Sequence, residues 1–251
     1  MSDITARNRE HFDQVASSHL NDWEPLIQSV IEELRDRRSW ISGKLGDDKA
    51  SKNDTGPIKL LDYACGSGTV SKAQPGLRQQ ALAPYVDETV GVDLSDNMVA
   101  EYNKWAQGQG FSYAKAHALQ LDLLAEPQST DPALSDFDVA VVCMALHHVA
   151  NPEALLCRLS KTLRPGGVCV VFDRVFSDER PELRADLPEQ ATKVLQTISK
   201  HGFTEEDMRK YFEGAGMAKN FEHAVIARPF KLTMFGQEME LKGFIARGEV
   251  A

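Results

Sequence analysis

Between residues 58 and 176, short continuous apolar runs alternate with longer stretches of helical periodicity. The runs IKLLDY, TVGVD, FDVAVVC and GVCVVFD are rich in β-branched residues, as expected for strands buried on both faces of a sheet. Between them, DNMVAEYNKWAQ and NPEALLCRLSKTLR predict helices, and Asn151 and Pro152 suit the start of the second helix. RPGG, residues 164–167, supplies a glycine that can end this helix. The alternation predicts an α/β fold with a mainly parallel sheet and helices on both faces.

The N-terminal part of the chain follows a different pattern. Residues 23–38 repeat apolar side chains at helical spacing, and we expect residues 1–42 to form a helical unit. GKLGDDKASKNDTGP, residues 43–57, has almost no apolar side chain and predicts a mobile loop. This loop would connect the helical unit to the alternating core, residues 58–176.

The C-terminal part begins with a polar, proline-interrupted connection. It continues into a helix that Thr204 can cap, so residues 177–216 predict a connection followed by a helix. Residues 217–251 predict two long strands around Gly236, arranged as a hairpin. A mainly parallel sheet can end in such a hairpin, so all 251 residues can form a single domain.

Composition and charge narrow the class of protein. Of the 251 residues, 42% are hydrophobic and 26% are charged, as in an ordinary globular domain. The net charge of -9 disfavours nucleic acid as a partner. No apolar run is long enough to cross a membrane, and the polar first residues lack the apolar core of a signal peptide. The cysteines, Cys65, Cys143, Cys157 and Cys169, form no Cys-x-x-Cys pair, which predicts reduced thiols, a cytoplasmic location and no metal site.

The segment LLDYACGSGTV places a glycine turn directly after the first predicted strand. In open parallel sheets, ligands bind beyond the carboxyl ends of the strands. Gly66 and Gly68 would let a ligand approach the backbone closely there, and with Ser71 they approximate a dinucleotide-binding pattern. Asp62, however, would repel the pyrophosphate of NAD. Its charge favours S-adenosylmethionine, which carries an ammonium and a sulfonium.

Five motifs together resemble the class I S-adenosylmethionine-dependent methyltransferases, in particular the small-molecule, ubiquinone-biosynthesis-like group. They are LLDYACGSGTVS, VGVDLSDNMVAEYN, LQLDLL, FDVAVVCMALHHV and LRPGGVCVVFD, and the resemblance covers about residues 12–243. It implies a three-layer, Rossmann-like sheet of seven strands, mostly parallel, with an antiparallel C-terminal hairpin. It also implies that residues 58–176 bind the cofactor, and that residues 1–42 and 177–216 cover a small-molecule acceptor.

The resemblance assigns cofactor contacts residue by residue. Asp62 and the following turn would hold the methionine end, and Asp93 would bind both ribose hydroxyls. The Cys143 region would line the sulfonium, and Asp122 would reach the adenine amino group. The implied cofactor-binding positions are Asp62, Ala64, Cys65, Gly66, Gly68, Asp93, Leu94, Met98, Asp122, Leu123, Cys143 and Met144. Ala64 stands where the family usually has glycine, which is tolerable if its φ is negative.

The acceptor side is less defined by the motifs. His147 and His148 follow the fourth strand, and we expect at most one of them to act as a general base. The family pattern favours His148 as a structural residue and leaves His147 free, although a structural role for both stays open. His19 or Trp23 would replace an expected N-terminal aromatic residue, and His201 is a further acceptor-side candidate.

The predicted function is methyl transfer from S-adenosylmethionine to O, N or C of a small organic acceptor, by in-line displacement. The alternative is a methyltransferase-like regulatory protein that binds the cofactor without efficient turnover. An RNA or protein methyltransferase is disfavoured by the acidic charge and by the lack of an Asn-Pro-Pro-Tyr-like motif. Asp62 disfavours an NAD-dependent oxidoreductase. The oligomeric state is left open.

Overall fold

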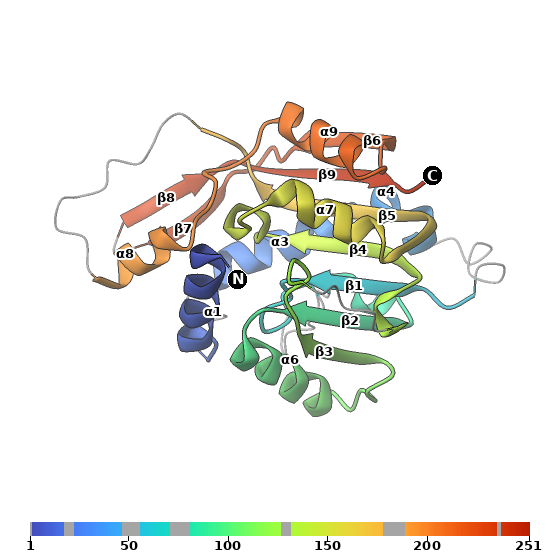
Figure 1. Cartoon of the computed structure of the whole chain (residues 1–251), viewed down its shortest axis with the longest axis horizontal. Helices are drawn as coiled ribbons and strands as arrows, with labels where there is room; N and C mark the ends of the chain where they lie inside the picture. Colours follow the sequence, from blue (N-terminus) through green and yellow to red (C-terminus); the bar gives the residue numbers. More distant parts are fainter. Residues whose placement is uncertain are drawn as a thin grey trace.

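Seven strands form one sheet in the order β3-β2-β1-β4-β5-β9-β6 in the computed structural model (Figure 1). The structure describes residues 2–17, 23–46, 56–70, 81–126, 132–177, 189–234 and 237–251. The strands are β1 Lys59–Tyr63, β2 Glu88–Asp93, β3 Ala116–Gln120, β4 Phe137–Cys143, β5 Leu163–Arg174, β6 Lys219–Val225, β7 Phe230–Met234, β8 Gln237–Leu241 and β9 Gly243–Glu249. The helices are α1 Asp3–Val15, α3 Glu24–Asp36, α4 Arg38–Ile41, α6 Asp96–Gly108, α7 Pro152–Ser160, α8 Glu189–Gln196 and α9 Glu205–Gly214. Short 3-10 helices are η1 Gly43–Leu45, η2 Ala83–Tyr85, η3 Pro132–Leu134 and η4 Leu146–His148.

Strand direction matches the predicted fold class. Strands β1 to β5 pair in parallel, and β9 pairs antiparallel with both β5 and β6. The predicted seven-stranded, mostly parallel sheet is therefore confirmed, with β9 as its antiparallel strand.

Alternate residues of each central strand pack on opposite faces of the sheet. In β1, Leu60 belongs to the apolar cluster that contains Val30 of α3, whereas Leu61 belongs to the cluster that contains Leu155 of α7 and Phe212 of α9. Both faces are covered, which explains why the strand sequences are continuously apolar.

Several elements from both ends of the chain lie at the carboxyl edge of the sheet. Figure 1 shows β1, β2 and β4 pointing toward α1, with α8 and the β7–β8 pair on the same side of the molecule. Helix α1 contacts both α6 and α8, and α3 contacts β7. This edge is where an open parallel sheet binds its ligands.

Two boundaries differ from the sequence-based expectations. Helix α7 ends at Ser160, and RPGG lies inside β5, where Gly166 has φ 72° and donates to the carbonyl of Val250. The glycine therefore serves an irregular stretch of the β4–β5 pairing and does not end the helix. The expected loop 43–57 begins with an ordered turn, because Leu45 of η1 is buried in the core.

The predicted pair of long C-terminal strands is interrupted. Strands β6 and β9 belong to the main sheet, whereas β7 and β8 pair with each other in a separate two-stranded sheet. Pro229 cannot donate to a ladder, and the ring of Phe230 packs directly against Gly243, where a Cβ would overlap it. Both features fall where the two sheets separate. Gly236 lies outside the described residues.

Candidate active site

A cavity of about 940 Å³ opens at the carboxyl edge of the sheet. Its walls come from the ends of β1, β2 and β4, from the segment after β3, and from α1, α3 and α8. The volume lies at the upper end of the range for small-molecule sites, so the cavity has room for a cofactor together with an acceptor.

The turn after β1 has the backbone conformation of a close-approach loop. Ala64, Gly66 and Gly68 have positive φ values of 52°, 52° and 106°. Ala64 therefore lacks the negative φ that would make alanine tolerable at this position. It adopts a backbone conformation that favours glycine. Ala64 and Gly66 line the cavity, whereas Gly68 is not among its lining residues. Cys65 also reaches the cavity, and its Sγ lies where a Cβ on Gly91 would meet it.

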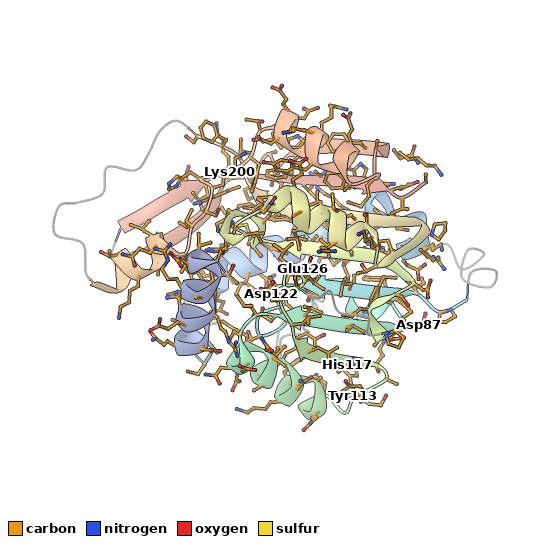
Figure 2. The ribbon with its side chains drawn as sticks, in the orientation of Figure 1. Asp87, Tyr113, His117, Asp122, Glu126 and Lys200 are labelled. Carbon is orange, nitrogen blue, oxygen red and sulfur yellow. The ribbon has the colours of Figure 1, made fainter. Side chains whose placement is uncertain are left out.

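Two of the predicted acids line the cavity near this turn. Asp62 is 1% exposed at the end of β1. Asp122 follows β3, and its Oδ1 accepts from the backbone N–H of Leu124 at 2.9 Å. Figure 2 shows Asp122 near the middle of the molecule and Lys200 on the side toward α9. Carboxylates so placed favour a ligand with cationic and hydrogen-bond-donating groups.

Asp93 ends β2 and is held by the turn itself. Its Oδ2 accepts from the backbone N–H of Gly66 at 2.8 Å, and its Oδ1 accepts from that of Ser95 at 2.9 Å. Burial raises the pKa of this carboxyl from 3.8 to about 6, although both hydrogen bonds act in the opposite direction. The carboxyl lines the cavity, where a ribose diol could donate to it.

The remaining cofactor positions divide into those that reach the cavity and one that does not. Leu94, Met98, Cys143 and Met144 line the cavity. Leu123 packs against the α7-side apolar cluster, and its neighbours Leu121 and Leu124 take the place in the cavity that was expected for it. Burial, together with Asp62 and Asp173, raises the pKa of the Cys143 thiol, which disfavours the nucleophilic thiolate.

His147 forms a buried pair with Asp173 of β5. The His147 Nδ1 lies 2.7 Å from Asp173 Oδ1, and the His147 backbone N–H donates to Oδ2 at 3.2 Å. Asp173 is fully buried, and His147 lines the cavity. The expectation that His147 is left free is therefore wrong. A carboxylate on Nδ1 selects the tautomer with the proton there, which leaves Nε2 as the acceptor.

His148 lines the same cavity but is held differently. Its Nδ1 lies 2.9 Å from the carbonyl oxygen of Thr197, and its ring packs edge-on against Phe12 and beside His147. Burial and, to a lesser degree, His147 lower the pKa of His148 well below its usual value, which favours the neutral ring. Both histidines reach the cavity from η4, the 3-10 turn that follows β4.

Helix α1 covers the site, although it carries no predicted site residue. The Asp13 Oδ1 accepts from the Ser95 hydroxyl at 2.5 Å and from the Asn97 backbone N–H at 3.1 Å. Asn8 donates to the carbonyl of His148 at 2.8 Å. The helix is therefore attached to both the β2 side and the β4 side of the cavity.

The sequence contained a signal for this cover. Asn8, His11, Phe12 and Val15 line the cavity and share one helical face, at spacings of three and four residues. Among the predicted acceptor-side residues, Trp23 lines the cavity. His201 is exposed and is not among the lining residues, and His19 lies outside the described residues.

Comparisons with known proteins agree with this geometry. A family model described as a methyltransferase domain matches residues 19–220. An uncharacterised methyltransferase of Schizosaccharomyces pombe is 27% identical over 241 residues, covering 87% of this chain and 81% of the relative. A ubiquinone biosynthesis O-methyltransferase of Azoarcus is 31% identical over 153 residues, covering 58% of this chain and 54% of the relative.

Solved structures share the fold. A S-adenosylmethionine-dependent methyltransferase from Anabaena variabilis matches with a TM-score of 0.63 at 16% identity, covering 100% of this chain and 96% of that one. Magnesium protoporphyrin IX methyltransferase from Synechocystis, with bound S-adenosylmethionine, matches with a TM-score of 0.57 at 15% identity, covering 100% and 99%.

The chain belongs to the methyltransferase-domain family, and it is a class I S-adenosylmethionine-dependent methyltransferase. The residues fit this cofactor: a backbone turn with positive φ, buried Asp62 and Asp93 on one cavity wall, and Met98 beside them. The predicted enzyme class and cofactor are confirmed, and the binding-only alternative is not favoured. In the described ranges, no helix is long and apolar enough to cross a membrane.

Proposed function

We propose that this methyltransferase acts on the hydroxyl oxygen of a small organic acceptor, with His147 as general base. The observation that carries the proposal is the 2.7 Å contact between His147 Nδ1 and the buried Asp173 carboxylate at the cavity wall. An acceptor that is already a free amine or a thiolate needs no such base, whereas a hydroxyl must lose a proton. The Azoarcus relative, named as an O-methyltransferase, also supports oxygen as the attacked atom.

S-adenosylmethionine supplies an activated methyl group, so the chain has to align the acceptor, exclude water and remove one proton. His147 would accept the hydroxyl proton on Nε2. Asp173 would keep Nδ1–H directed toward itself and stabilise the imidazolium that forms. Met144 directly follows β4, the strand that lies between β1 with its turn and β5 with Asp173.

Covering elements would keep water from the reacting groups. Helix α1 places Phe12 against His148, and Leu26 of α3 and Trp23 just before it line the wall. Closure of an apolar cover strengthens the electrostatic interaction between Asp173 and a protonated His147.

Turnover of the His147→Ala variant tests the base. We expect turnover to fall by roughly 10²–10⁴-fold, with the affinity for S-adenosylhomocysteine little changed. Asp173→Asn should also lower turnover, because a neutral amide stabilises the imidazolium less, while Asp173→Glu should restore part of the turnover. His201→Ala, outside the cavity, is the matched control and should keep full activity. Full turnover by His147→Ala with a hydroxylated acceptor would remove the base from the mechanism.

A further inference from the structure

The charged residues that line the cavity are divided by sign. The carboxylates, Asp62, Asp93 and Asp122, lie at the ends of β1 and β2 and just beyond β3. The cations, Arg174 and Lys193, lie at the end of β5 and on α8. Both cations therefore come from other elements than the three lining carboxylates. Of the two, Arg174 carries the argument that follows.

Arg174 has hydrogen-bonding capacity that the described residues do not use. One terminal nitrogen donates to the carbonyl of Lys200 at 3.0 Å. Its Nε is buried and has no hydrogen-bond partner in the part of the chain that the structure describes. Arg174 directly follows Asp173, the partner of His147, and its charge also contributes to the lowered pKa of His148. A buried donor without a partner is unfavourable unless a ligand satisfies it.

The Asp173 carboxylate is not the hydrogen-bond partner of the Arg174 Nε. Its oxygens accept from His147 and from the backbone N–H of Arg174 at 2.7 Å, not from the guanidinium. The strand order also separates Arg174 from the cofactor turn, because β4 lies between β1 and β5. The free donor therefore belongs to the acceptor end.

The walls around these cations are apolar. The same cavity is lined by Trp23, which precedes α3, by Leu26 and Ile27 of α3, and by Val194 and Ile198 from the α8 region. Such walls bind an apolar body, and the few charged groups fix its orientation. Arg is suited to a planar carboxylate, which it can bind through two parallel hydrogen bonds.

We infer that the acceptor is an apolar hydroxy acid, whose carboxylate binds Arg174, with Lys193 nearby, while its hydroxyl meets His147. The inference rests on the proposed function and adds the substrate class. In the reaction, the hydroxyl proton moves to His147 Nε2, the carbon–sulfur bond breaks and a carbon–oxygen bond forms. The carboxylate is unchanged. The products are a methoxy acid and S-adenosylhomocysteine, and the proton is released to solvent from His147.

A binding comparison tests the carboxylate site without requiring turnover. Calorimetry of the full chain, loaded with S-adenosylhomocysteine, compares a hydroxynaphthoate with its neutral carboxamide. We expect the acid to bind about 10-fold to 100-fold more tightly. Arg174→Gln should remove this preference, Arg174→Lys should keep part of it, and Lys193→Gln should reduce it about twofold to fivefold. Lys104→Gln on α6, which also removes one positive charge but lies outside the cavity, is the control.

The outcomes separate this inference from the proposed function. Equal affinity of acid and carboxamide, or no binding of either, would overturn the hydroxy-acid class. A loss of S-adenosylhomocysteine affinity in Arg174→Gln, with the acid preference intact, would assign Arg174 to the cofactor and overturn the inference as well. Preference for the acid without methylation of its hydroxyl would support the anion site and count against the proposed O-methylation.

Discussion

At the scale of single residues, the backbone conformation of Ala64 and the burial of the Asp93 carboxyl each carry an energetic cost. Ala64 occupies a left-handed conformation that favours glycine, and Asp93 keeps a buried carboxyl at the end of β2. Such costs persist at functional sites where the surrounding structure fixes them.

Replacement of Ala64 by glycine is expected to stabilise the protein. The positive φ of 52° is strained for alanine, and removal of the Cβ should raise the free energy of unfolding by about 1 kcal/mol. Denaturant unfolding measures this change. Ala106→Gly in α6, where the backbone is helical, is the matched control and should destabilise by about 1 kcal/mol or more. No stabilisation of Ala64→Gly relative to the parent chain would contradict the strain.

The raised pKa of Asp93 predicts the direction of two pH dependences. Its pKa rises from 3.8 in the unfolded chain to about 6 in the folded one. The folded state therefore holds this proton more tightly, so the contribution of Asp93 to stability is greatest below 3.8 and is lost as the pH rises through about 6. As the pH falls from 7 to 5, the free energy of unfolding of the parent chain should therefore rise relative to that of the Asp93→Asn variant. Affinity for S-adenosylhomocysteine should fall over the same interval, because the protonated carboxyl accepts ribose hydrogen bonds less well. Urea unfolding and calorimetry across this range measure both quantities, and flat difference curves would contradict the assignment.

At the scale of elements, most of the sheet could be predicted from local sequence pattern, whereas the cover is implied only by the family resemblance and the contacts that hold it could not be predicted. Four buried strands have continuous apolar runs, and the turn motifs stand at their ends, so β1, β2, β4 and β5, with Asp62 and Asp93, follow from local pattern. Strand β3 has no such run and is implied only by the seven-stranded resemblance. The position of α1 depends on contacts such as Asn8 to His148, across 140 residues of chain, which no local pattern encodes. The same holds for Asp173, which looks like an ordinary strand-end acid until β5 is placed beside β4.

Helix α1 is expected to depend on Asp13 for its attachment. Asp13→Ala removes the bonds to Ser95 and Asn97, and amide exchange in residues 2–17 should accelerate about tenfold. Asp3→Ala, at the exposed start of the same helix, is the matched control. Exchange in this helix should slow in the parent chain when cofactor and acceptor bind together. Equal exchange in Asp13→Ala and the parent chain would show that another contact holds the cover.

At the scale of the whole molecule, one cavity is lined by acids from the ends of β1 and β2 and the segment after β3, and by Arg174 and Lys193 from β5 and α8. The cofactor end is built from the β1, β2 and β4 edges of a single sheet, so ligand binding should stabilise the entire domain. S-adenosylhomocysteine at about 100 times its Kd should add about 2.7 kcal/mol to the free energy of unfolding. NAD at the same concentration should add nothing, because Asp62 opposes its pyrophosphate. Thermal unfolding with each ligand measures the difference, and a comparable shift with NAD would contradict the charge argument.

Methyl transfer from isotopically labelled S-adenosylmethionine tests the central claim most directly. The protein is incubated with cofactor labelled with carbon-13 in the methyl group and with a hydroxynaphthoate, and the product is identified by NMR. The account predicts a labelled aryl methyl ether, formed by the parent chain and by His201→Ala, and formed roughly 10²–10⁴-fold more slowly by His147→Ala. A labelled methyl ester in place of the ether, or an ether formed equally fast without His147, would contradict it.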